Sequence, residues 1–169
     1  FIFINTGRDT EISGRINKIK KYLPQTGSIL ILNGDTIFDF KLSDFFLSHK
    51  RKNKNISLAT FDTKIDLGLI QIKENKPIKF NKSIFVTEFQ TNKKKYLAYS
   101  GFFLSKSKYL KNFNFNPKKD FELEMFNKSI KSQKVNFFQV KKGLCFSIDN
   151  VKSLQYANNF LNVKNLISY

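Results

Sequence analysis

The stretch Ser28-Ile29-Leu30-Ile31-Leu32-Asn33-Gly34-Asp35-Thr36 decides how the rest of the chain is interpreted. Its apolar run from Ile29 to Leu32 is typical of a strand that is buried on both faces. The run stops at Asn33-Gly34, and the next residue, Asp35, presents a carboxylate. In open α/β sheets, ligands bind at the carboxyl ends of the strands, so Asp35 is a candidate site residue. Asn-Gly-Asp is also ordinary turn sequence, and the motif alone does not separate the two interpretations.

The composition predicts one globular domain with an unusual charge. A chain of 169 residues with 41% hydrophobic and 25% charged residues can bury a substantial core, and we expect residues 1–169 to form a single domain. The net charge of +17 favours phosphorylated ligands, nucleic acid or an anionic membrane as partners. However, arginine occurs only as Arg8, Arg15 and Arg51, and the chain is rich in Lys, Asn, Ile and Phe. Because these four residues share codons made of A and T, we attribute much of the charge to an AT-rich genome.

Two residue types that carry much of protein chemistry occur once each. The single Cys145 excludes an internal disulfide and a cysteine-based zinc site, and its apolar neighbours predict a buried, inert thiol. The single His49 lies among basic residues at the predicted end of a helix, where a cation suits the helix dipole. No apolar run reaches membrane-spanning length and no signal peptide is recognisable, so we expect no membrane partner and a cytoplasmic location.

Hydrophobic periodicity predicts strands that alternate with helices early in the chain and a middle that is rich in strands. This order is typical of an α/β protein with a mixed sheet. We expect strands at 1–5, 28–32, 56–61, 67–72, 78–80, 84–89, 96–104, 134–140 and 144–148. We expect helices at 15–23, 43–50, 105–111, 121–130 and 151–161, a hairpin turn at 74–77, a polar loop at 91–95 and a turn at 141–143.

Four motifs in a fixed order carry a resemblance to a known family. They are Thr6-Gly7-x-x-Thr10-x-x-Ser13-Gly14-Arg15-Ile16, Asn33-Gly34-Asp35, Gly68-Leu69-Ile70 and Ser147-Ile148-Asp149. This set resembles the sugar-phosphate nucleotidyltransferases over nearly the whole chain, and the first motif, with Lys20–Tyr22, is most similar to the glucose 1-phosphate cytidylyltransferase branch. The resemblance implies a Rossmann-like, glycosyltransferase-A-like three-layer α/β fold with a mixed central sheet that lacks its first βα units.

The resemblance also implies a reaction and a cofactor. The family transfers a nucleotidyl group from a nucleoside triphosphate to a sugar 1-phosphate and releases pyrophosphate. Asp35 and Asp149 match the two carboxylates that bind the catalytic Mg²⁺ in the family. Mg²⁺ needs only one or two protein carboxylates, because phosphate oxygens and water complete its coordination. For Asp149, a residue placed at a helix N-terminus for the dipole remains the alternative.

Further candidate residues are carried over from the same motifs. The nucleotide-binding candidates are Gly14, Arg15 and Gly34, and the sugar-phosphate-binding candidates are Gly68, Lys82 and Gly101. Each has a structural alternative: a helix start for Gly14 and Arg15, a strand bulge for Gly68 and a solvated surface position for Lys82. The segments around Lys82 and Gly101 depart from the family pattern, since Asn81-Lys82-Ser83 replaces Glu-Lys-Pro and Ser100 replaces a glycine.

The chain begins at Phe1, inside an apolar run and without an initiator Met, so we expect a preceding segment. The family's Gly-x-Gly-Thr-Arg loop, which grips the triphosphate, is expected there, and the 169 residues alone are expected to be inactive. Two other classes stay open: a basic nucleic-acid-binding domain, which the scattered lysines disfavour, and a catalytically dead regulatory homologue. The segment from Asn33 to Asp39 resembles guanylyl- and thymidylyltransferases more than cytidylyltransferases. The base, the sugar and homo-oligomer formation therefore also stay open.

Overall fold

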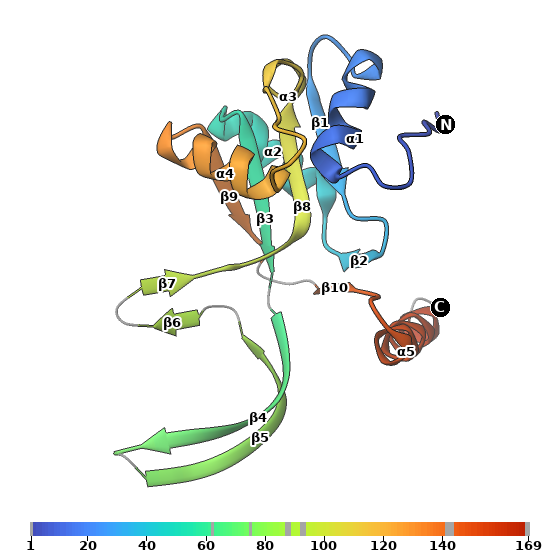
Figure 1. The fold of residues 1–169 in the computed structure, drawn as a ribbon. Helices are drawn as coiled ribbons and strands as arrows, with labels where there is room; N and C mark the ends of the chain where they lie inside the picture. Colours follow the sequence, from blue (N-terminus) through green and yellow to red (C-terminus); the bar gives the residue numbers. More distant parts are fainter. Residues whose placement is uncertain are drawn as a thin grey trace. The chain divides into compact units, whose positions relative to one another are not determined.

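The computed structural model describes residues 2–61, 63–74, 76–86, 89–91, 94–140 and 144–167. Its helices are α1 (Ile12–Ile19), α2 (Leu42–Lys52), α3 (Ser107–Asn112), α4 (Phe121–Lys131) and α5 (Val151–Ile167), and a 3-10 turn covers Lys20–Tyr22 (Figure 1). Its strands are β1 (Ser28–Leu32), β2 (Thr36–Asp39), β3 (Ile56–Phe61), β4 (Thr63–Lys73), β5 (Lys76–Val86), β6 (Phe89–Thr91), β7 (Lys94–Tyr96), β8 (Ala98–Lys106), β9 (Val135–Gln139) and β10 (Leu144–Ser147). The chain divides into two compact units: unit 1 comprises residues 1–31, 42–58 and 102–138, and unit 2 comprises the rest.

A mixed four-stranded sheet with the strand order β1-β8-β3-β9 carries helices on both faces in unit 1. Successive residues of a strand point to opposite faces, and two neighbours on β8 show where the helices lie. The ring of Phe102 lies 6.4 Å from that of Phe45 on α2, whereas the ring of Phe103 lies 5.2 Å from that of Phe126 on α4. The sheet is therefore sandwiched between helices, which confirms the predicted α/β fold with a mixed sheet.

Unit 2 consists of paired strands and α5. β2 pairs with β10, β4 with β5 and β6 with β7, all antiparallel. The predicted hairpin turn near residue 74 is confirmed, but one continuous strand, β5, replaces the two predicted after it. The polar loop predicted at 91–95 is wrong for the residues that the structure describes, because Thr91 pairs with Lys94 and Gln90 with Lys95. Polar side chains did not prevent pairing, since a hairpin stabilises its strands through backbone hydrogen bonds.

The strand predicted at residues 1–5 does not form over the described residues 2–5. Ile2 and Phe3 are 75% and 95% exposed. An apolar sequence becomes a strand only where a neighbouring strand accepts and donates the backbone hydrogen bonds, and this segment pairs with no described residue.

The two strands predicted at 134–140 and 144–148 are confirmed as β9 and β10. They belong to different sheets: β9 joins the four-stranded sheet, and β10 pairs with β2, a strand that periodicity did not predict. The predicted turn at 141–143 lies outside the described residues. Cys145, on β10, is half-buried instead of fully buried. Among the described residues, no helix combines the length and the apolar character needed to cross a bilayer.

His49 lies in the last turn of α2, as predicted, but it is buried, and its lowered pKa disfavours the cation expected there. Its side chain is 4% exposed, with Nδ1 2.8 Å from Ser57 Oγ and Nε2 3.1 Å from Ser28 Oγ. Burial and the nearby charge of Lys106 lower the pKa of His49 below its ordinary value of 6.5. The helix does end in basic residues, but the face that carries His49 packs against β3 and the start of β1.

Acid is therefore expected to destabilise the protein through His49. With the pKa of the folded state below 6.5, the unfolded chain binds a proton more readily, and the free energy of unfolding falls as the pH is lowered through 6.5. The slope cannot exceed one proton, about 1.4 kcal/mol per pH unit. Urea unfolding between about pH 5 and 7, above the range where most carboxylates titrate, measures it. The protein has one histidine, so the His49→Gln variant should lose this dependence. An unchanged slope in that variant would contradict the assignment.

Candidate functional site

The pairing of β2 with β10 brings the two predicted metal-binding carboxylates into neighbouring chain segments. Thr36 is the register partner of Ser147, and the backbone N–H of Ile148 donates to the carbonyl oxygen of Asp35 over 2.8 Å. Asp35 is therefore bonded to the residue that immediately precedes Asp149. Both aspartates are solvent-exposed. The two segments are more than 100 residues apart in sequence, so the pairing, and not the local sequence, places them together.

Two hydroxyl groups meet across the strand pair that precedes or follows the aspartates. Thr36 Oγ1 lies 3.4 Å from Ser147 Oγ across the strand pair, and it donates to Asp35 Oδ1 over 3.3 Å. Thr36 and Ser147 were not among the predicted site residues, although Ser147 stands inside one of the motifs that carried the resemblance and Thr36 directly follows another. Their positions beside the two aspartates were the signal that could have found them.

Asp149 is held at the start of α5. The next residue, Asn150, caps the helix: its Oδ1 accepts from Ser153 N over 2.9 Å, and its own backbone N–H donates to Ser153 Oγ over 3.0 Å. This reciprocal capping satisfies N–H groups that a helix start leaves unpaired. Asp149 therefore follows a strand and precedes a capped helix start. This position keeps both readings of Asp149 open, as a metal ligand and as a residue that benefits from the helix dipole.

Gly101 lies in close contact with the end of β1. Its φ is +71°, and a Cβ built at this position would lie 2.5 Å from Asn33 Nδ2 and 2.9 Å from Asn33 Cγ. The glycine on β8 therefore lets the Asn33 amide approach the backbone. Gly34, the next residue after Asn33, has open space around it, since no atom lies within 4 Å of its hypothetical Cβ.

The Gly101→Ala variant is expected to be destabilised by about 1–2 kcal/mol, because an L residue pays that amount for a left-handed backbone and its methyl group would also displace Asn33. The Gly34→Ala variant is the matched control, since it adds the same methyl group in open space, and it should unfold within about 0.5 kcal/mol of the parent. Urea midpoints measure both variants. Equal midpoints for the two would show that the close approach is not a constraint.

Gly14 and Arg15 hold the segment 6–10 against α1. A Cβ on Gly14 would lie 2.8 Å from Thr10 Cγ2, so only glycine fits without a shift. Arg15 Nε donates to Thr10 O over 2.6 Å, and its guanidinium also reaches Arg8 O over 3.2 Å. α1 begins at Ile12, so both residues lie in its first turn, which agrees with the alternative reading of them as a helix start. Both residues belong to unit 1, and a role with a nucleotide stays a prediction.

Gly68 and Lys82 are register partners in the β4–β5 hairpin. The register shifts between Ile65 and Gly68, which is the strand irregularity considered as the alternative reading of this glycine. The hairpin therefore brings together two of the three predicted sugar-phosphate residues, and Gly101 lies on a different strand. The structure thus groups Asp35 with Asp149, and Gly68 with Lys82.

Among the described residues, no group of three or more His, Cys, Asp or Glu side chains is arranged to hold a metal ion. A pair of carboxylates is nevertheless a complete protein contribution for Mg²⁺, which takes its other ligands from phosphates and water. The donor chemistry at Asp35 and Asp149, two exposed carboxylates beside two hydroxyls, fits this ion.

No protein-family model and no curated protein match the sequence. The fold does match solved structures, among them a protein from Bacillus anthracis assigned as a glucose-1-phosphate thymidylyltransferase and solved in complex with sucrose. The TM-score is 0.63 at 15% identity, and the match covers 91% of this chain. The chain spans 62% of the length of that protein. The likeness establishes the fold class, a Rossmann-like α/β fold of the nucleotidyltransferase type.

Proposed function

We propose that this chain is the metal-supplying and sugar-binding part of a sugar-1-phosphate nucleotidyltransferase. The observation that carries the proposal is the β2–β10 pairing, which bonds Ile148 to Asp35 and so brings Asp149 next to Asp35. The fold shared with the Bacillus anthracis protein supports it, because ligands of open α/β sheets bind where the strands end, and Asp35 follows the end of β1.

Asp35 and Asp149 would hold Mg²⁺ in the proposed enzyme, with Thr36 and Ser147 orienting the two segments. When bound, the ion would neutralise charge on the phosphate oxygens. The protein groups do little covalent work in such a reaction and contribute mainly by positioning and by electrostatics. Exposed carboxylates suit this role, because the ligand must reach them from solvent.

The proposed reaction is a substitution at the α-phosphorus of a nucleoside triphosphate. An oxygen of the sugar 1-phosphate forms a bond to that phosphorus, the bond to the β-phosphate oxygen breaks, and pyrophosphate leaves with the electron pair. Lys82, across the hairpin from Gly68, would bind the phosphate of the sugar, and Gly101 with Asn33 would contact the sugar ring. Gly14, Arg15 and Gly34 would contact the nucleotide.

CTP and glucose 1-phosphate are the substrates that we propose. The motif Thr6 to Ile16 supports cytidine, and the assignment of the Bacillus anthracis protein supports glucose 1-phosphate as the acceptor. That protein is named for a thymidine nucleotide, whereas the motif from Thr6 to Ile16 favours cytidine, so the two observations disagree about the base. The proposal thus includes Mg²⁺ as the cofactor and these two molecules as the substrates. It also includes that the isolated 169 residues are inactive.

Pyrophosphate release tests the proposal. The complete reading frame that contains this chain is incubated with glucose 1-phosphate and, in turn, CTP, dTTP, UTP, GTP and ATP. We expect pyrophosphate with CTP and little with the other four. Release with another triphosphate would correct the base. No release with any pair would instead favour the catalytically dead homologue, and tight binding to DNA or RNA in a gel shift at physiological salt would favour the nucleic-acid-binding alternative.

A further inference from the structure

A cavity of about 590 Å³ lies in unit 1, where β1 and α3 begin and β8 and α2 end. Its described lining includes three lysines, Lys50, Lys106 and Lys108, and no carboxylate. This end of β1 is the opposite one from Asp35, which follows the last residue of the strand. The size falls within the range of small-molecule sites, about 300–1,000 Å³.

The three amines differ in how they are held. Lys106 Nζ donates to the backbone oxygen of Asn53 over 3.2 Å and to its Oδ1 over 2.7 Å, so this ammonium is fixed in place. Lys50 and Lys108 are exposed, and neither makes a hydrogen bond or an ion pair with another residue in the described part of the chain. Three positive charges around one cavity repel each other, and two of them have no described partner.

Two polar side chains of the lining, Ser28 and His49, are bonded to each other before any ligand arrives. Ser28 Oγ lies 3.1 Å from His49 Nε2, and the far side of the imidazole is bonded to Ser57. In the last turn of α2, His49 O accepts from Asn53 N, and just after the helix Asn53 O accepts from Lys106 Nζ, so these two carbonyl oxygens are paired. Gly27, with φ of +88°, has no atom of the described residues within 4 Å of a hypothetical Cβ.

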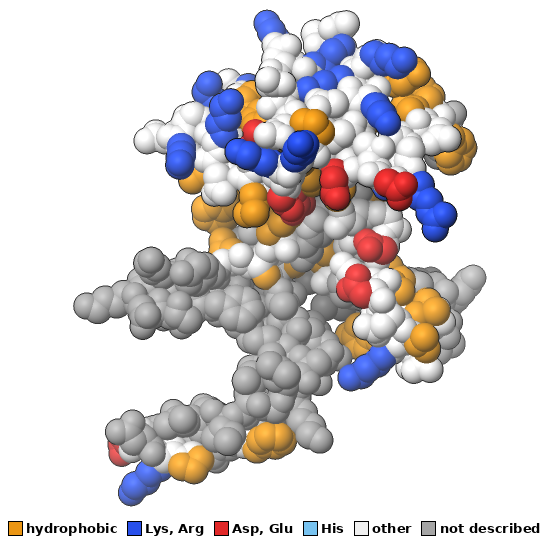
Figure 2. Space-filling view, viewed as in Figure 1, with side chains coloured by type: hydrophobic (Ala, Val, Ile, Leu, Met, Phe, Trp, Pro, Cys, Tyr) orange, Lys and Arg blue, Asp and Glu red, His pale blue; other side chains and the backbone are white. Residues whose placement is uncertain are grey.

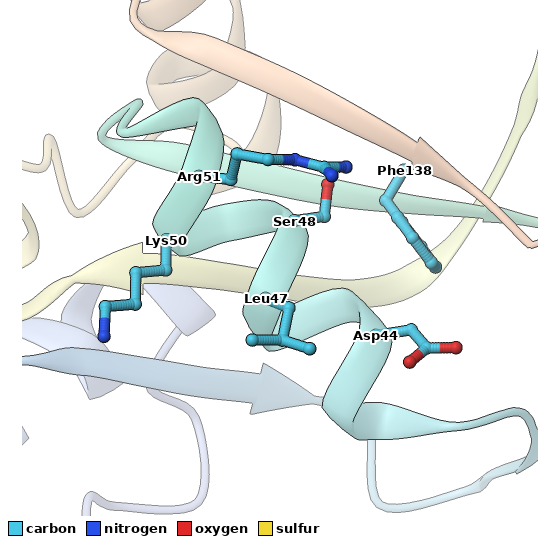
Figure 3. A pocket seen from close by; sticks show the side chains of 6 residues that line it. All are labelled: Asp44, Leu47, Ser48, Lys50, Arg51 and Phe138. Atoms are coloured by element: carbon cyan, nitrogen blue, oxygen red, sulfur yellow. The ribbon is translucent and has the colours of Figure 1, made fainter.

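A neighbouring cavity on α2 provides a contrast. Figure 3 shows Asp44, Leu47, Ser48, Lys50, Arg51 and Phe138 around it. The carboxylate of Asp44 offsets the charge of Lys50 and Arg51, so this cavity lacks the uniform charge of the first one. Figure 2 shows lysines and arginines spread over the visible face of unit 1, so a basic surface alone does not mark a site. What marks a site is a group of lysines that line one cavity with no acidic residue among its described lining residues.

We propose that the cavity at the start of β1 binds the phosphate group of a small phosphorylated molecule, held by Lys50, Lys106, Lys108 and the Ser28 hydroxyl. A phosphate group carries about −1.5 to −2 charges at neutral pH and has three acceptor oxygens, which matches several amines better than a single carboxylate does. This site does not depend on the proposed nucleotidyl transfer, because it shares no residue with the Asp35–Asp149 pair.

The single histidine allows a local test. Inorganic phosphate is added to the chain with labelled histidine, with chloride replaced so that the ionic strength stays constant, and the His49 ring signals are followed by NMR. We expect a saturable shift with a millimolar dissociation constant and a rise in the pKa of His49, because a bound anion offsets the charge of Lys106. The Lys50→Gln variant should bind at least about threefold more weakly. The Lys118→Gln variant, in an exposed loop of the same unit, should bind as the parent does.

Two results would overturn the site. One is a His49 signal that does not saturate up to about 20 mM phosphate, well above a millimolar dissociation constant. The other is equal binding by the parent, Lys50→Gln and Lys108→Gln. Both lysines are exposed and without a described partner, so the variants should stay folded, which circular dichroism verifies. Loss of pyrophosphate release in an Asp35 variant would leave this binding unchanged, so failures of the two proposals are distinguishable.

Discussion

Replacing Asp35 by Asn, or Asp149 by Asn, is expected to lower nucleotidyl transfer by the complete enzyme at least about 100-fold while the fold stays intact. The amide keeps the size of the side chain but removes the charge that would bind Mg²⁺, and the loss of one electrostatic group of this kind costs about 10²–10³ in turnover. Both side chains are exposed, so neither substitution disturbs the core. Pyrophosphate release measures the effect on turnover.

A second readout separates metal binding from activity. Mn²⁺ titrated into the 169-residue chain and followed by electron paramagnetic resonance should bind more weakly to either variant than to the parent. The Asp44→Asn variant is the control, since Asp44 is an exposed aspartate of α2, and its turnover and Mn²⁺ binding should match the parent. Unchanged turnover and unchanged Mn²⁺ binding in the Asp35 and Asp149 variants would refute the metal assignment.

Replacing Phe45 by Ala is expected to reduce the free energy of unfolding by about 3–5 kcal/mol. Phe45 is fully buried, and its ring lies 6.4 Å from the ring of Phe102 and 5.5 Å from that of Phe138. It therefore joins α2 to β8 and β9 on one face of the sheet. A domain has a total stability of about 5–15 kcal/mol, so the empty space left by the missing Phe45 ring would bring the protein close to unfolding. Urea unfolding at 25 °C measures the loss.

Phe137 provides the matched control for this substitution. It is the same residue type on β9, but it is 61% exposed, and the Phe137→Ala variant should lose less than about 1 kcal/mol. Similar losses in the two variants would contradict the arrangement in which Phe45 of α2 packs on the face of the sheet that carries Phe102 and Phe138.

The central strands and most helices followed from local pattern. β1 and β3 are apolar runs that need no context to be recognised, and α2 and α4 were predicted to within two residues. Hydrophobic pattern gave wrong predictions where a neighbouring strand decides whether a segment becomes a strand. Residues 2–5 are as apolar as β1 but have no neighbouring strand among the described residues, whereas the polar Lys94 and Lys95 form a strand because Thr91 and Gln90 pair with them. Side-chain polarity reports burial, but backbone pairing makes a strand.

His49 shows the same limit for a single residue. Its basic neighbours in sequence and its place at a helix end suggested a cation that suits the helix dipole. The side chain instead lies on the face of the helix that packs on the sheet, where Ser28 of β1 and Ser57 of β3 contact the imidazole. The cavity beside it was also absent from the sequence-based candidates. Lys50, Lys106 and Lys108 come from two distant segments. Because lysine is frequent along the whole chain, these three do not stand out in the sequence.

The sequence by itself determined the α/β class, the strand that ends at Asp35 and the two aspartates, because apolar runs and motif residues are local properties. Only the tertiary structure decided that Ile148 bonds to Asp35, so that Asp149 belongs beside it, and that Gly101 yields space to Asn33. These contacts join segments that are 68 residues or more apart in the chain. Strand pairing in the folded protein determines them, and the hydrophobic pattern of a single segment does not specify its pairing partner.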